Sequence, residues 1–566
     1  MKRYELREGV PEKVTQELAG YPELVQKLLF HRGISDYNAA EIFFKPDFER
    51  DLHDPFLLPN MDEAVNRILL AIKENHRFTI YSDYDADGIP ASVALHDFFK
   101  KIGYENFDVY IPHRNREGFG LNKKAIQEIA SRGSKLMITV DCGTSDVDEV
   151  ALARSLGIDV IITDHHEAHE VLPDAIIVNH KLIGSKYPER ILCGAGVVFK
   201  LIQALIAKGD FNLPKGFEKW FLDMIGIATL ADMVPLVGEN RALAHYGLIV
   251  LRKSPRPGLQ QLLRKTRTNQ NQISVMDVGF TIAPRINAAS RMGEPDVAFN
   301  LLAEKSFEKV GALVDHLHEI NDQRKGHVAV ITKAVYQKMH EMENSDELKV
   351  IVAGNPLWQP SLLGLAASSV VEKYQKPVFL WGRGDGEELK GSCRSIEGVS
   401  TLELLNDVSD LFHAHGGHDQ AGGFVVQSEH VDFLQDRLSA AYEKCVSEQS
   451  EQVVFLDAEI TIPEINYSFF NQVQKLSPFG IGNEEPKFLV KNILVNDVQK
   501  FGKNKEHIKI ICEDNGKQIE AISFFSNEDS FSNPVKKDMK ISIVAIIEKN
   551  QWGKSSLRLR ILDVLL

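Results

Sequence analysis

Four short motifs hold the side chains of this sequence that could do chemistry, and each follows an apolar run. Y-S-D-Y-D-A-D-G, V-D-C-G-T, T-D-H-H and A-T-L-A-D-M-V-P supply Asp83, Asp85, Asp87, Asp141, Asp164, His165, His166 and Asp232. Carboxylates crowded in this way cannot all ionise cheaply beside one another without cations. Mixed carboxylate and imidazole ligands suit Mn²⁺, and Mg²⁺ fits where water completes its shell. The motifs therefore predict two divalent ions, which could activate water for attack on phosphorus.

Each motif alone also has an ordinary structural explanation. A D-x-D sequence is more often a solvated loop or a helix N-cap, and a His-His pair is more often surface or core than ligand. Asp141 could be a turn residue, and Asp232 could cap a helix. Their combination at successive element ends favours the metal site, because ligands of parallel sheets bind beyond the carboxyl ends of the strands.

The elements that must position these residues alternate between strands and helices. Near-continuous apolar runs, typical of strands buried on both faces, are Phe78–Tyr81, Leu136–Val140, Asp159–Thr163 and Ala175–Val178. Helical patterns between them are Ala91–Lys101, Lys123–Ser131 and Asp146–Leu156. This alternation predicts a parallel sheet in an α/β catalytic domain over about residues 61–305.

The rest of the chain divides into four further segments. Residues 1–60 are expected to form short helices, and residues 306–345 one long helix, or a pair, that connects two lobes. Residues 346–448 predict a second α/β unit with strands at Lys349–Val352 and Pro377–Trp381 and a helix at Leu362–Tyr374. Short strands with turn signals over 452–566 predict a small β-barrel or sandwich.

Composition limits the class of protein and its compartment. The net charge of −14 argues against a simple nucleic-acid binder with a basic surplus, although a local basic groove remains compatible with it. The start of the chain lacks the apolar segment of a signal peptide, and no apolar run has the length of a membrane span. The five scattered cysteines favour a reducing compartment. We therefore expect a cytoplasmic protein without a membrane partner.

Taken in order, D-Y-D-A-D-G, V-D-C-G and D-H-H resemble the DHH phosphoesterase superfamily. Within it, nearly the whole chain is similar to the bacterial single-strand-specific 5′→3′ DNA exonucleases. Strings that carry this similarity include L-H-D-P-F-L-L-P at 52–59, C-G-A-G-V-V-F-K-L at 193–201, I-A-P-R-I-N-A-A-S-R-M at 282–292, G-G-H-D-Q-A-G-G-F at 416–424 and S-P-F-G-I-G-N at 477–483. The resemblance implies a DHH domain, a long connecting helix, a DHH-associated domain and an oligonucleotide-binding (OB) barrel.

The resemblance also implies roles for individual residues. It makes Asp83, Asp85, Asp87, Asp141, His165, His166 and Asp232 metal ligands or their near neighbours. Asp164 is expected to orient a histidine rather than to bind metal. Phosphate binding would fall to Arg285, Asn287 and Arg291 before a helix, to Ser392 and Arg394 in a turn, and to Gly416, Gly417 and His418 in a loop. An ordinary turn or a surface ion pair is the alternative for these residues.

Two further features concern the DNA itself. In the barrel, Lys500, Phe501, Lys503, Lys505, His507 and Lys509 interleave positive charge with an aromatic ring. This pattern suits a single-strand platform, and a solvated hairpin face is the alternative.

Relatives commonly have W-H-P-G-V-I-G before the helix of the second lobe, whereas this chain has W-Q-P-S-L-L-G, with Gln359 and Ser361. Glutamine cannot act as an acid, so rate or end preference could differ here.

The expected function is therefore 5′→3′ hydrolysis of single-stranded DNA to 5′-mononucleotides in recombination and repair. By resemblance, the expected partners are single-stranded DNA, a single-strand-binding protein and a helicase, and the chain is expected to be a monomer. One alternative is a phosphodiesterase for cyclic dinucleotides or short oligoribonucleotides, for which the N-terminal region and the barrel would be superfluous. Another is a non-catalytic DNA-binding relative, which would be expected to lose metal-ligand acids that this chain retains.

Overall fold

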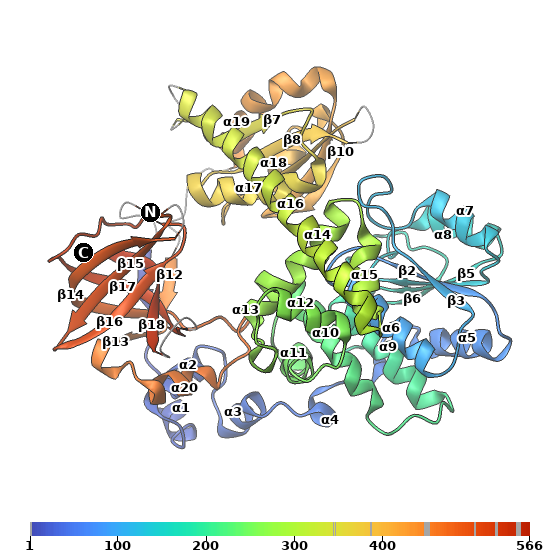
Figure 1. The fold of residues 1–566 in the computed structure, drawn as a ribbon, viewed down its shortest axis with the longest axis horizontal. Coiled ribbons are helices and arrows are strands. Elements are labelled where there is room, and N and C mark those ends of the chain that lie inside the picture. The colour runs from blue at the N-terminus through green and yellow to red at the C-terminus, as the bar shows by residue number, and fades with distance from the viewer. Residues whose placement is uncertain are drawn as a thin grey trace. The chain divides into compact units, whose positions relative to one another are not determined.

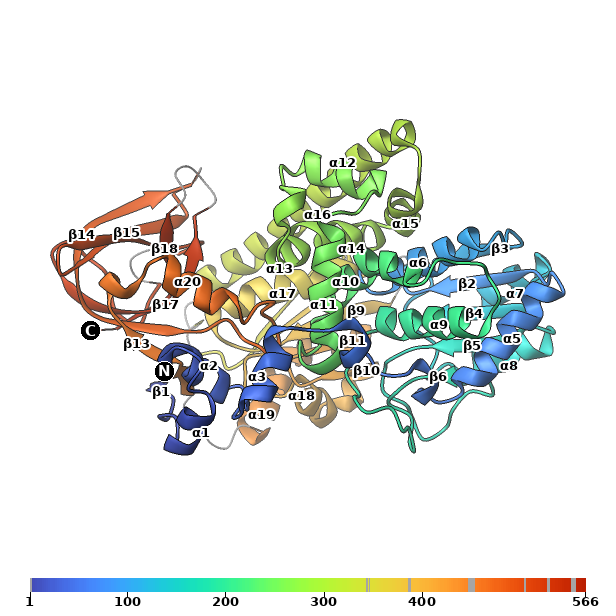
Figure 2. The ribbon, with the colours of Figure 1, turned by 90° about the horizontal axis from the view of Figure 1, so that it is seen from below.

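The computed structural model describes residues 3–342, 345, 347–384, 388–445, 453–502, 505–526, 530–550 and 556–565. The chain forms two compact units. One contains residues 52–234 and 238–450, and the other contains residues 1–51, 235–237 and 451–566. Figures 1 and 2 show the elements of both units from two directions. The N-terminal segment thus shares a unit with the C-terminal barrel.

The larger unit is built first around a parallel five-stranded sheet of order β3-β2-β4-β5-β6. Its strands are β2 (Phe78–Ser82), β3 (Phe107–Tyr110), β4 (Leu136–Val140), β5 (Asp159–Thr163) and β6 (Ile176–Val178). The predicted parallel sheet is confirmed, and β4 and β5 have the predicted bounds. The sequence reading missed β3, whose residues are only partly buried and show no continuous apolar run.

Helices cover both faces of this sheet (Figure 2). They are α5 (Met61–Lys73), α6 (Gly88–Lys101), α7 (Lys123–Ser131), α8 (Val147–Ser155) and α9 (Gly194–Lys208). Helices α7 and α8 share one hydrophobic cluster with the sheet, while α6 and α9 contact each other. Because both faces are covered, the strands can be almost wholly apolar, and polar chemistry is confined to the strand ends.

A helical subdomain follows the sheet and leads into one long helix. Its elements are α10 (Leu222–Ala231), α11 (Gly238–Leu251), α12 (Pro257–Lys265), α13 (Val275–Asp277), a π-helical turn at Val278–Ile282, α14 (Ala283–Arg291) and α15 (Pro295–Ala303). The long helix predicted to connect two lobes is confirmed as α16 (Phe307–Glu341). It contacts α12, α14 and α15 on one side and α17 on the other.

The second lobe of the larger unit is a mixed sheet of order β10-β11-β9-β8-β7, in which only β7 and β8 are parallel. Its elements are β7 (Ile351–Gly354), α17 (Pro360–Tyr374), β8 (Val378–Arg383), β9 (Leu389–Arg394), α18 (Thr401–Asp407), β10 (Phe412–His418), β11 (Ala421–Val426) and α19 (Leu434–Cys445). Helices α16 and α17 share one hydrophobic cluster with the sheet, and α18 and α19 share another.

The smaller unit joins the N-terminal helices to a closed five-stranded barrel. The barrel strands are β14 (Phe488–Phe501), β15 (His507–Asp514), β16 (Lys517–Ser523), β17 (Lys540–Lys549) and β18 (Leu557–Leu565), and pairing of β14 with β17 closes it. The same unit also contains α1 (Glu12–Glu17), α2 (Glu23–Phe30), α3 (Tyr37–Phe44), α4 (Phe48–Asp51), β12 (Val453–Leu456), β13 (Ala458–Ile460) and α20 (Tyr467–Gln474).

The N-terminal segment completes the hydrophobic core of the smaller unit. Leu28 of α2 is part of the cluster that fills the barrel region. A short strand, β1 (Arg3–Leu6), pairs in parallel with β12, and the sequence reading expected only helices there. Arg32 donates hydrogen bonds to the Asn483 side chain and the Glu484 carbonyl, at 2.7 and 2.5 Å. Segments from both ends of the sequence are thus tied into one body.

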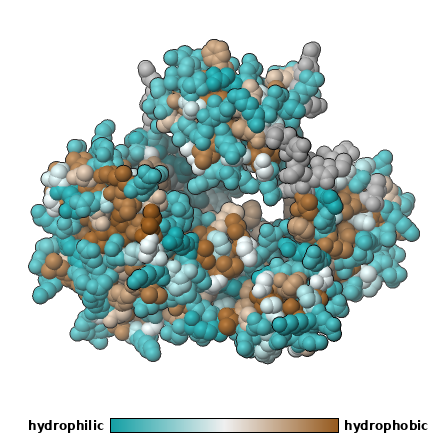
Figure 3. Space-filling model, turned by 180° about the vertical axis from the view of Figure 1, so that it is seen from behind, coloured by the Kyte–Doolittle hydropathy of each residue, from teal (hydrophilic) through white to brown (hydrophobic). Residues whose placement is uncertain are grey.

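The surface gives little information by hydropathy alone. The face drawn in Figure 3 is a mosaic of hydrophilic and hydrophobic side chains. None of the helices in the described part of the chain is both long and apolar enough to cross a membrane. Single exposed apolar side chains are common on protein surfaces, so an exposed ring is informative only through its neighbours.

Candidate metal centre and arginine cluster

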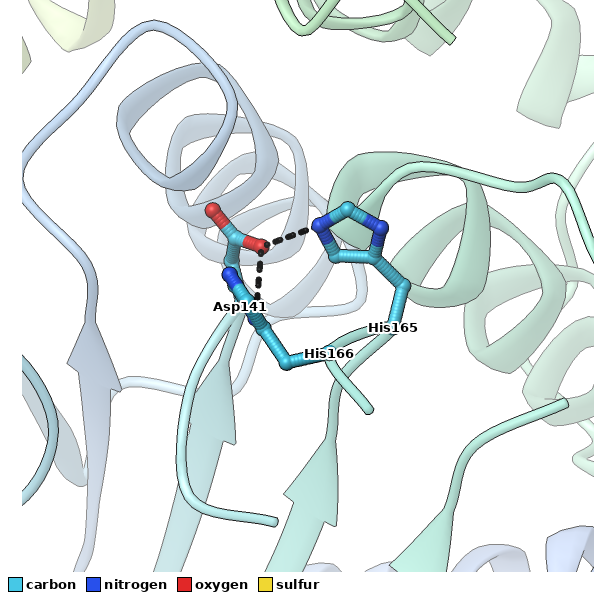
Figure 4. A group of neighbouring side chains, drawn as sticks. All are labelled: Asp141, His165 and His166. Atoms are coloured by element: carbon cyan, nitrogen blue, oxygen red, sulfur yellow. Dashed lines mark ion pairs between the residues drawn. The ribbon is translucent and has the colours of Figure 1, made fainter. Parts of the chain in front are cut away.

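The structure brings the seven predicted metal-binding side chains together. Three overlapping groups each place their ligand atoms within 4.8 Å of one another: Asp83, Asp85 and Asp141; Asp141, His165 and His166; Asp87, His165 and Asp232. Figure 4 shows the carboxylate of Asp141 directed at the ring of His165. Its Oδ1 lies 3.3 Å from His165 Nε2 and 4.0 Å from His166 Nδ1. We call these seven residues the metal centre.

Backbone amides fix the acids of the first motif. Asp85 Oδ1 accepts hydrogen bonds from the amides of Asp87 and Gly88, which begins α6. The carboxylate of Asp87 accepts from the amides of Gly194 and Ala195 at 2.7 and 2.8 Å. These two amides open α9, where backbone donors lack helical partners and the helix dipole favours negative charge. The local fold therefore holds both carboxylates through backbone donors.

Asp141 requires an unusual backbone and a small neighbour. It has a φ of 63°, which turns the chain sharply at the end of β4, and its amide donates to the Thr163 carbonyl. A Cβ atom on Gly194 would lie 2.4 Å from Asp141 Oδ1, so only glycine fits at the start of α9. The side chain of Asp141 is thus pressed against a helix N-terminus.

Asp164 contacts the histidines rather than the shared ligand cluster. Its Oδ1 accepts a 2.7 Å hydrogen bond from His166 Nδ1 and bonds from the amides of His165 and His166. Its Oδ2 accepts from the Thr144 amide at 3.0 Å. Although burial raises the pKa of Asp164, the hydrogen bond with His166 brings it below the usual range. The arrangement is the one expected of a carboxylate that orients an imidazole.

Without cations, the metal centre is an electrostatically unfavourable cluster. Burial, with the charge of Asp85, raises the pKa of Asp87 to about 7. Burial, with the charge of Asp87, raises the pKa of Asp232 to about 8, and burial and neighbouring acids also raise the pKa of Asp141. Asp83 Oδ1 and Asp141 Oδ1 are buried and have no hydrogen-bond partner in the described structure. Buried orphan oxygens in a set of oxygen and nitrogen donors fit divalent cations.

The histidines differ in their protonation. Burial and the neighbouring His166 lower the pKa of His165 to about 3, which leaves a neutral ring with a free lone pair at neutral pH. Burial lowers the pKa of His166, but the hydrogen bond and charge of Asp164 outweigh it and raise the value to about 9. The ring of Phe119, a 55% exposed side chain, meets the His166 ring edge-on with centroids 5.1 Å apart. Sequence reasoning missed this aromatic neighbour, because a single Phe has no distinctive spacing.

A second charged region of the larger unit gathers arginines. The residues are Arg114, Arg285, Arg291, Arg324 and Arg394, which we call the arginine cluster. Burial and the charge of Arg114 lower the pKa of Arg291 to about 9, and Arg324 and Arg394 act in the same direction. Burial and the charge of Arg285 lower the pKa of Arg324. None of the five forms an ion pair with a carboxylate in the described part of the chain. Such a cluster is suited to bind an anion.

Sequence reasoning identified three members of this cluster but misjudged their elements. Arg285 and Arg291 lie within α14 rather than before a helix, and Arg394 lies in strand β9 with Ser392 rather than in a turn. Gly416, Gly417 and His418 form the end of β10, paired with β11, and not a loop. Arg114 and Arg324 were missed, because they lie far apart in sequence from the other members and outside any motif.

Asn287 binds the backbone of the first motif. Its Oδ1 accepts a 2.8 Å hydrogen bond from the amide of Ala86, inside the first motif. It therefore ties α14 to the turn that presents Asp85 and Asp87. The sequence suggested Asn287 as a phosphate ligand. Because its Oδ1 is already used as an acceptor, the group of Asn287 that could bind phosphate is its side-chain NH₂, which donates hydrogen bonds.

Comparison with known proteins decides the family. Residues 77–229 match the family model described as DHH family, N-terminal domain; residues 347–444 match the DHHA1 domain; residues 456–563 match the RecJ OB domain. A Bacillus subtilis protein named single-stranded-DNA-specific exonuclease RecJ is 36% identical over 559 residues, covering 97% of this chain and 69% of the relative. The chain belongs to the RecJ family. A Haemophilus influenzae protein of the same name is 30% identical, with 92% of this chain and 94% of the relative covered.

Solved RecJ structures support the fold and the fit of the metal centre. The crystal structure of Thermus thermophilus RecJ in complex with Mn²⁺ matches with a TM-score of 0.83 and 26% identity, covering all of this chain and 79% of that one. The corresponding complex with Mg²⁺ matches with a TM-score of 0.77 and 25% identity, and covers 78% of that chain. Both ions suit the carboxylate and imidazole donors gathered in this chain.

The barrel that matches the RecJ OB domain carries an aromatic cluster at one end. His507 lies at its centre, with ring centroids 5.0 Å from Phe501, 5.2 Å from Phe524 and 4.8 Å from Phe525. Phe525 is 82% exposed. Lys500 is the penultimate residue of β14, before Phe501; Lys505 precedes β15, and Lys503 lies outside the described residues. Sequence reasoning identified Phe501 and His507 but missed Phe524 and Phe525, which join the cluster only through strand pairing.

Proposed function

We propose that this chain is a metal-dependent exonuclease that degrades single-stranded DNA in the 5′→3′ direction and releases 5′-mononucleotides. The observation that carries the proposal is the metal centre, in which five motif acids and both histidines converge while two buried carboxylate oxygens lack hydrogen-bond partners in the described structure. Family membership gives the substrate, because the relatives are named single-stranded-DNA-specific exonucleases. The direction and the product are part of the proposal.

In the proposed mechanism the seven residues of the metal centre hold two Mn²⁺ or Mg²⁺ ions. When bound, these ions would supply Lewis acidity toward the scissile phosphodiester and lower the pKa of water. The protein keeps its ligands ready for this task. Asp164 holds His166 by its Nδ1, and the low pKa of His165 keeps that ring neutral. Asn287 and the α9 amides hold the first motif in place.

The arginine cluster would bind the phosphates of the strand. A guanidinium that has no carboxylate partner can donate several N–H bonds to phosphate oxygens. The cluster combines residues from both lobes of the larger unit, since Arg291 lies in α14 and Arg394 in β9. Ser392 could add a hydroxyl donor from the same strand. The arginines would thus recognise the phosphate backbone of a DNA strand and not its base sequence.

The barrel would bind more distant nucleotides of the same strand. Exposed rings of Phe524 and Phe525 offer stacking surfaces that tolerate any base, and Lys500 and Lys505 offer charge for phosphates. We also propose, from the family resemblance alone, that the protein is a cytoplasmic monomer that acts with a single-strand-binding protein and a helicase in recombination and repair.

Digestion of end-labelled DNA tests the function. With Mn²⁺ or Mg²⁺, a 5′-labelled single strand should lose its label at once as a mononucleotide, whereas a 3′-labelled strand should shorten progressively. Duplex DNA of the same sequence should be resistant, and EDTA should stop the reaction. Faster hydrolysis of dinucleotides than of long strands would favour a small-substrate phosphodiesterase. Binding of single strands without any shortening would indicate a non-catalytic relative.

A further inference from the structure

Two reciprocal hydrogen bonds join Ser361 to Arg291. Ser361 is the second residue of α17 and is 8% exposed, and Arg291 is the last residue of α14. The Ser361 hydroxyl donates to the Arg291 carbonyl at 2.9 Å, and Arg291 Nη1 donates to the Ser361 carbonyl at 2.5 Å. The two residues are 70 positions apart in sequence. The pair therefore links the lobe of the metal centre to the second lobe.

The carbonyl of Arg291 has no helical donor of its own. In an α-helix it would accept from the amide four residues on, but that residue is Pro295, which has no N–H. The described backbone hydrogen bonds at this helix end go to Ala288, Ala289 and Ser290 instead. The Ser361 hydroxyl thus supplies the donor that the end of α14 lacks.

The return bond fixes the guanidinium of Arg291. One N–H of this group is used by the Ser361 carbonyl, which leaves four for an anion. Arg394 lies against the same turn of α17, because a Cβ on Gly364 would be 2.7 Å from its Nη2. The first turn of α17 therefore borders two members of the arginine cluster, and in the described part of the chain Ser361 is its only side chain that forms a hydrogen bond with one of them.

We infer that Ser361 is a positioning residue that sets the phosphate affinity of Arg291. This inference rests on the proposed function of the arginine cluster and names the residue that preorganises it. Ser361 does not itself need to touch DNA. Among the described residues no hydrogen bond or ion pair joins Ser361 to the metal centre, so its contribution belongs to substrate binding rather than to the chemical step.

Steady-state kinetics on single-stranded DNA test this role. Ser361→Ala should raise KM about fivefold, the value expected for one lost hydrogen bond, with kcat within about twofold of the parent. Ser361→Thr keeps the hydroxyl and should restore KM. Ser368→Ala is a matched control, since among the described residues the Ser368 hydroxyl donates to the Gly364 carbonyl of its own helix and to no residue of another element. It should leave KM and kcat unchanged.

A double-mutant cycle separates positioning through Arg291 from a general structural effect. In an Arg291→Met background, Ser361→Ala should cause no further rise in KM, because the residue through which it acts is gone. A full fivefold rise in that background, a fall in kcat alone, or no change from Ser361→Ala in the parent protein would each overturn the inference. Circular dichroism checks that each variant is folded.

Calorimetric titration with inorganic phosphate gives a readout that needs no catalysis. Ser361→Ala and Arg291→Met should both weaken phosphate binding, and the double variant should be no weaker than Arg291→Met. If the protein degrades no DNA yet shows this pattern, the proposed function fails and the positioning role stands. Equal phosphate binding by the parent and Ser361→Ala would refute the positioning role whatever the activity.

Discussion

The metal centre and the arginine cluster have opposite charges, but they are alike in one respect: in each, like charges gather without enough opposite charge beside them. In one, burial and neighbouring charge raise the pKa of Asp87 and Asp232, and in the other, burial and neighbouring charge lower the pKa of Arg291 and Arg324, which have no ion pair with a carboxylate among the described residues. They differ in origin. Six of the seven residues of the metal centre follow strands of one parallel sheet, whereas the arginines come from a loop, two helices and an antiparallel strand of two lobes. The first region is set by local chain geometry, and the second only by packing of the lobes.

The largest effect that separates the two regions is expected from Asp141→Ala. Asp141 belongs to two of the three groups of candidate ligands. Its removal takes away the carboxylate that these two groups share. We expect kcat to fall at least about 10³-fold, because the loss affects transition-state charge stabilisation and metal retention together. Binding of single-stranded DNA should change less than about threefold. Single-turnover cleavage and fluorescence anisotropy measure the two quantities.

A surface acid provides the control for this variant. Asp148 lies in the first turn of α8, pairs with Lys123 and is largely exposed, so Asp148→Ala should leave both quantities unchanged. Near-normal turnover by Asp141→Ala would refute the assignment of the metal centre. Loss of DNA affinity equal to the loss of turnover would show that the two regions are not separable.

The arginine cluster should respond in the opposite way. Arg394→Met removes a charge while keeping much of the side-chain volume, and we expect KM for single-stranded DNA to rise roughly 10- to 100-fold, as for a lost charged hydrogen bond. The value of kcat should fall less than about threefold. Arg437→Met, which breaks an exposed pair with Asp410 in the same lobe, is the control and should have no effect. A fall in kcat with unchanged KM would place Arg394 with the chemistry instead.

The contrast in origin also explains what the sequence could predict. Asp83, Asp141 and His165 each follow an apolar run, and parallel strands end at a common rim, so their convergence follows from the pattern alone. The bounds of β4 and β5 were predictable for the same reason. Strand β3 was not, because its residues are only partly buried and lack the continuous apolar signal.

The arginine cluster was predictable only in part because its members have no shared spacing. Motifs led to Arg285, Arg291 and Arg394. The other two members, Arg114 in the loop after β3 and Arg324 in α16, join them only through the tertiary packing of these elements with α14. Ser392 was placed in a turn and Gly417 in a loop because glycine and serine usually mark such segments. Here the glycines permit close strand pairing: a Cβ on Gly417 would lie 2.4 Å from the Ala421 carbonyl.

The smallest expected effect is the sharpest test of the contrast, and it concerns salt. For a single strand, the logarithm of the binding constant falls with the logarithm of salt concentration by about 0.7 for each phosphate contact. Arg394→Met should reduce the steepness of this slope by about 0.7, because it removes one such contact. Asp141→Ala should leave the slope unchanged even though it abolishes cleavage, because its carboxylate faces cations rather than DNA phosphates. Anisotropy titrations over a range of salt concentrations measure both slopes.

An unchanged slope for Arg394→Met would mean that its guanidinium supports the fold and does not bind phosphate, although the KM effect could still be present. The slope therefore distinguishes a charge that contacts DNA from one that only shapes the site, which neither KM nor kcat can do alone.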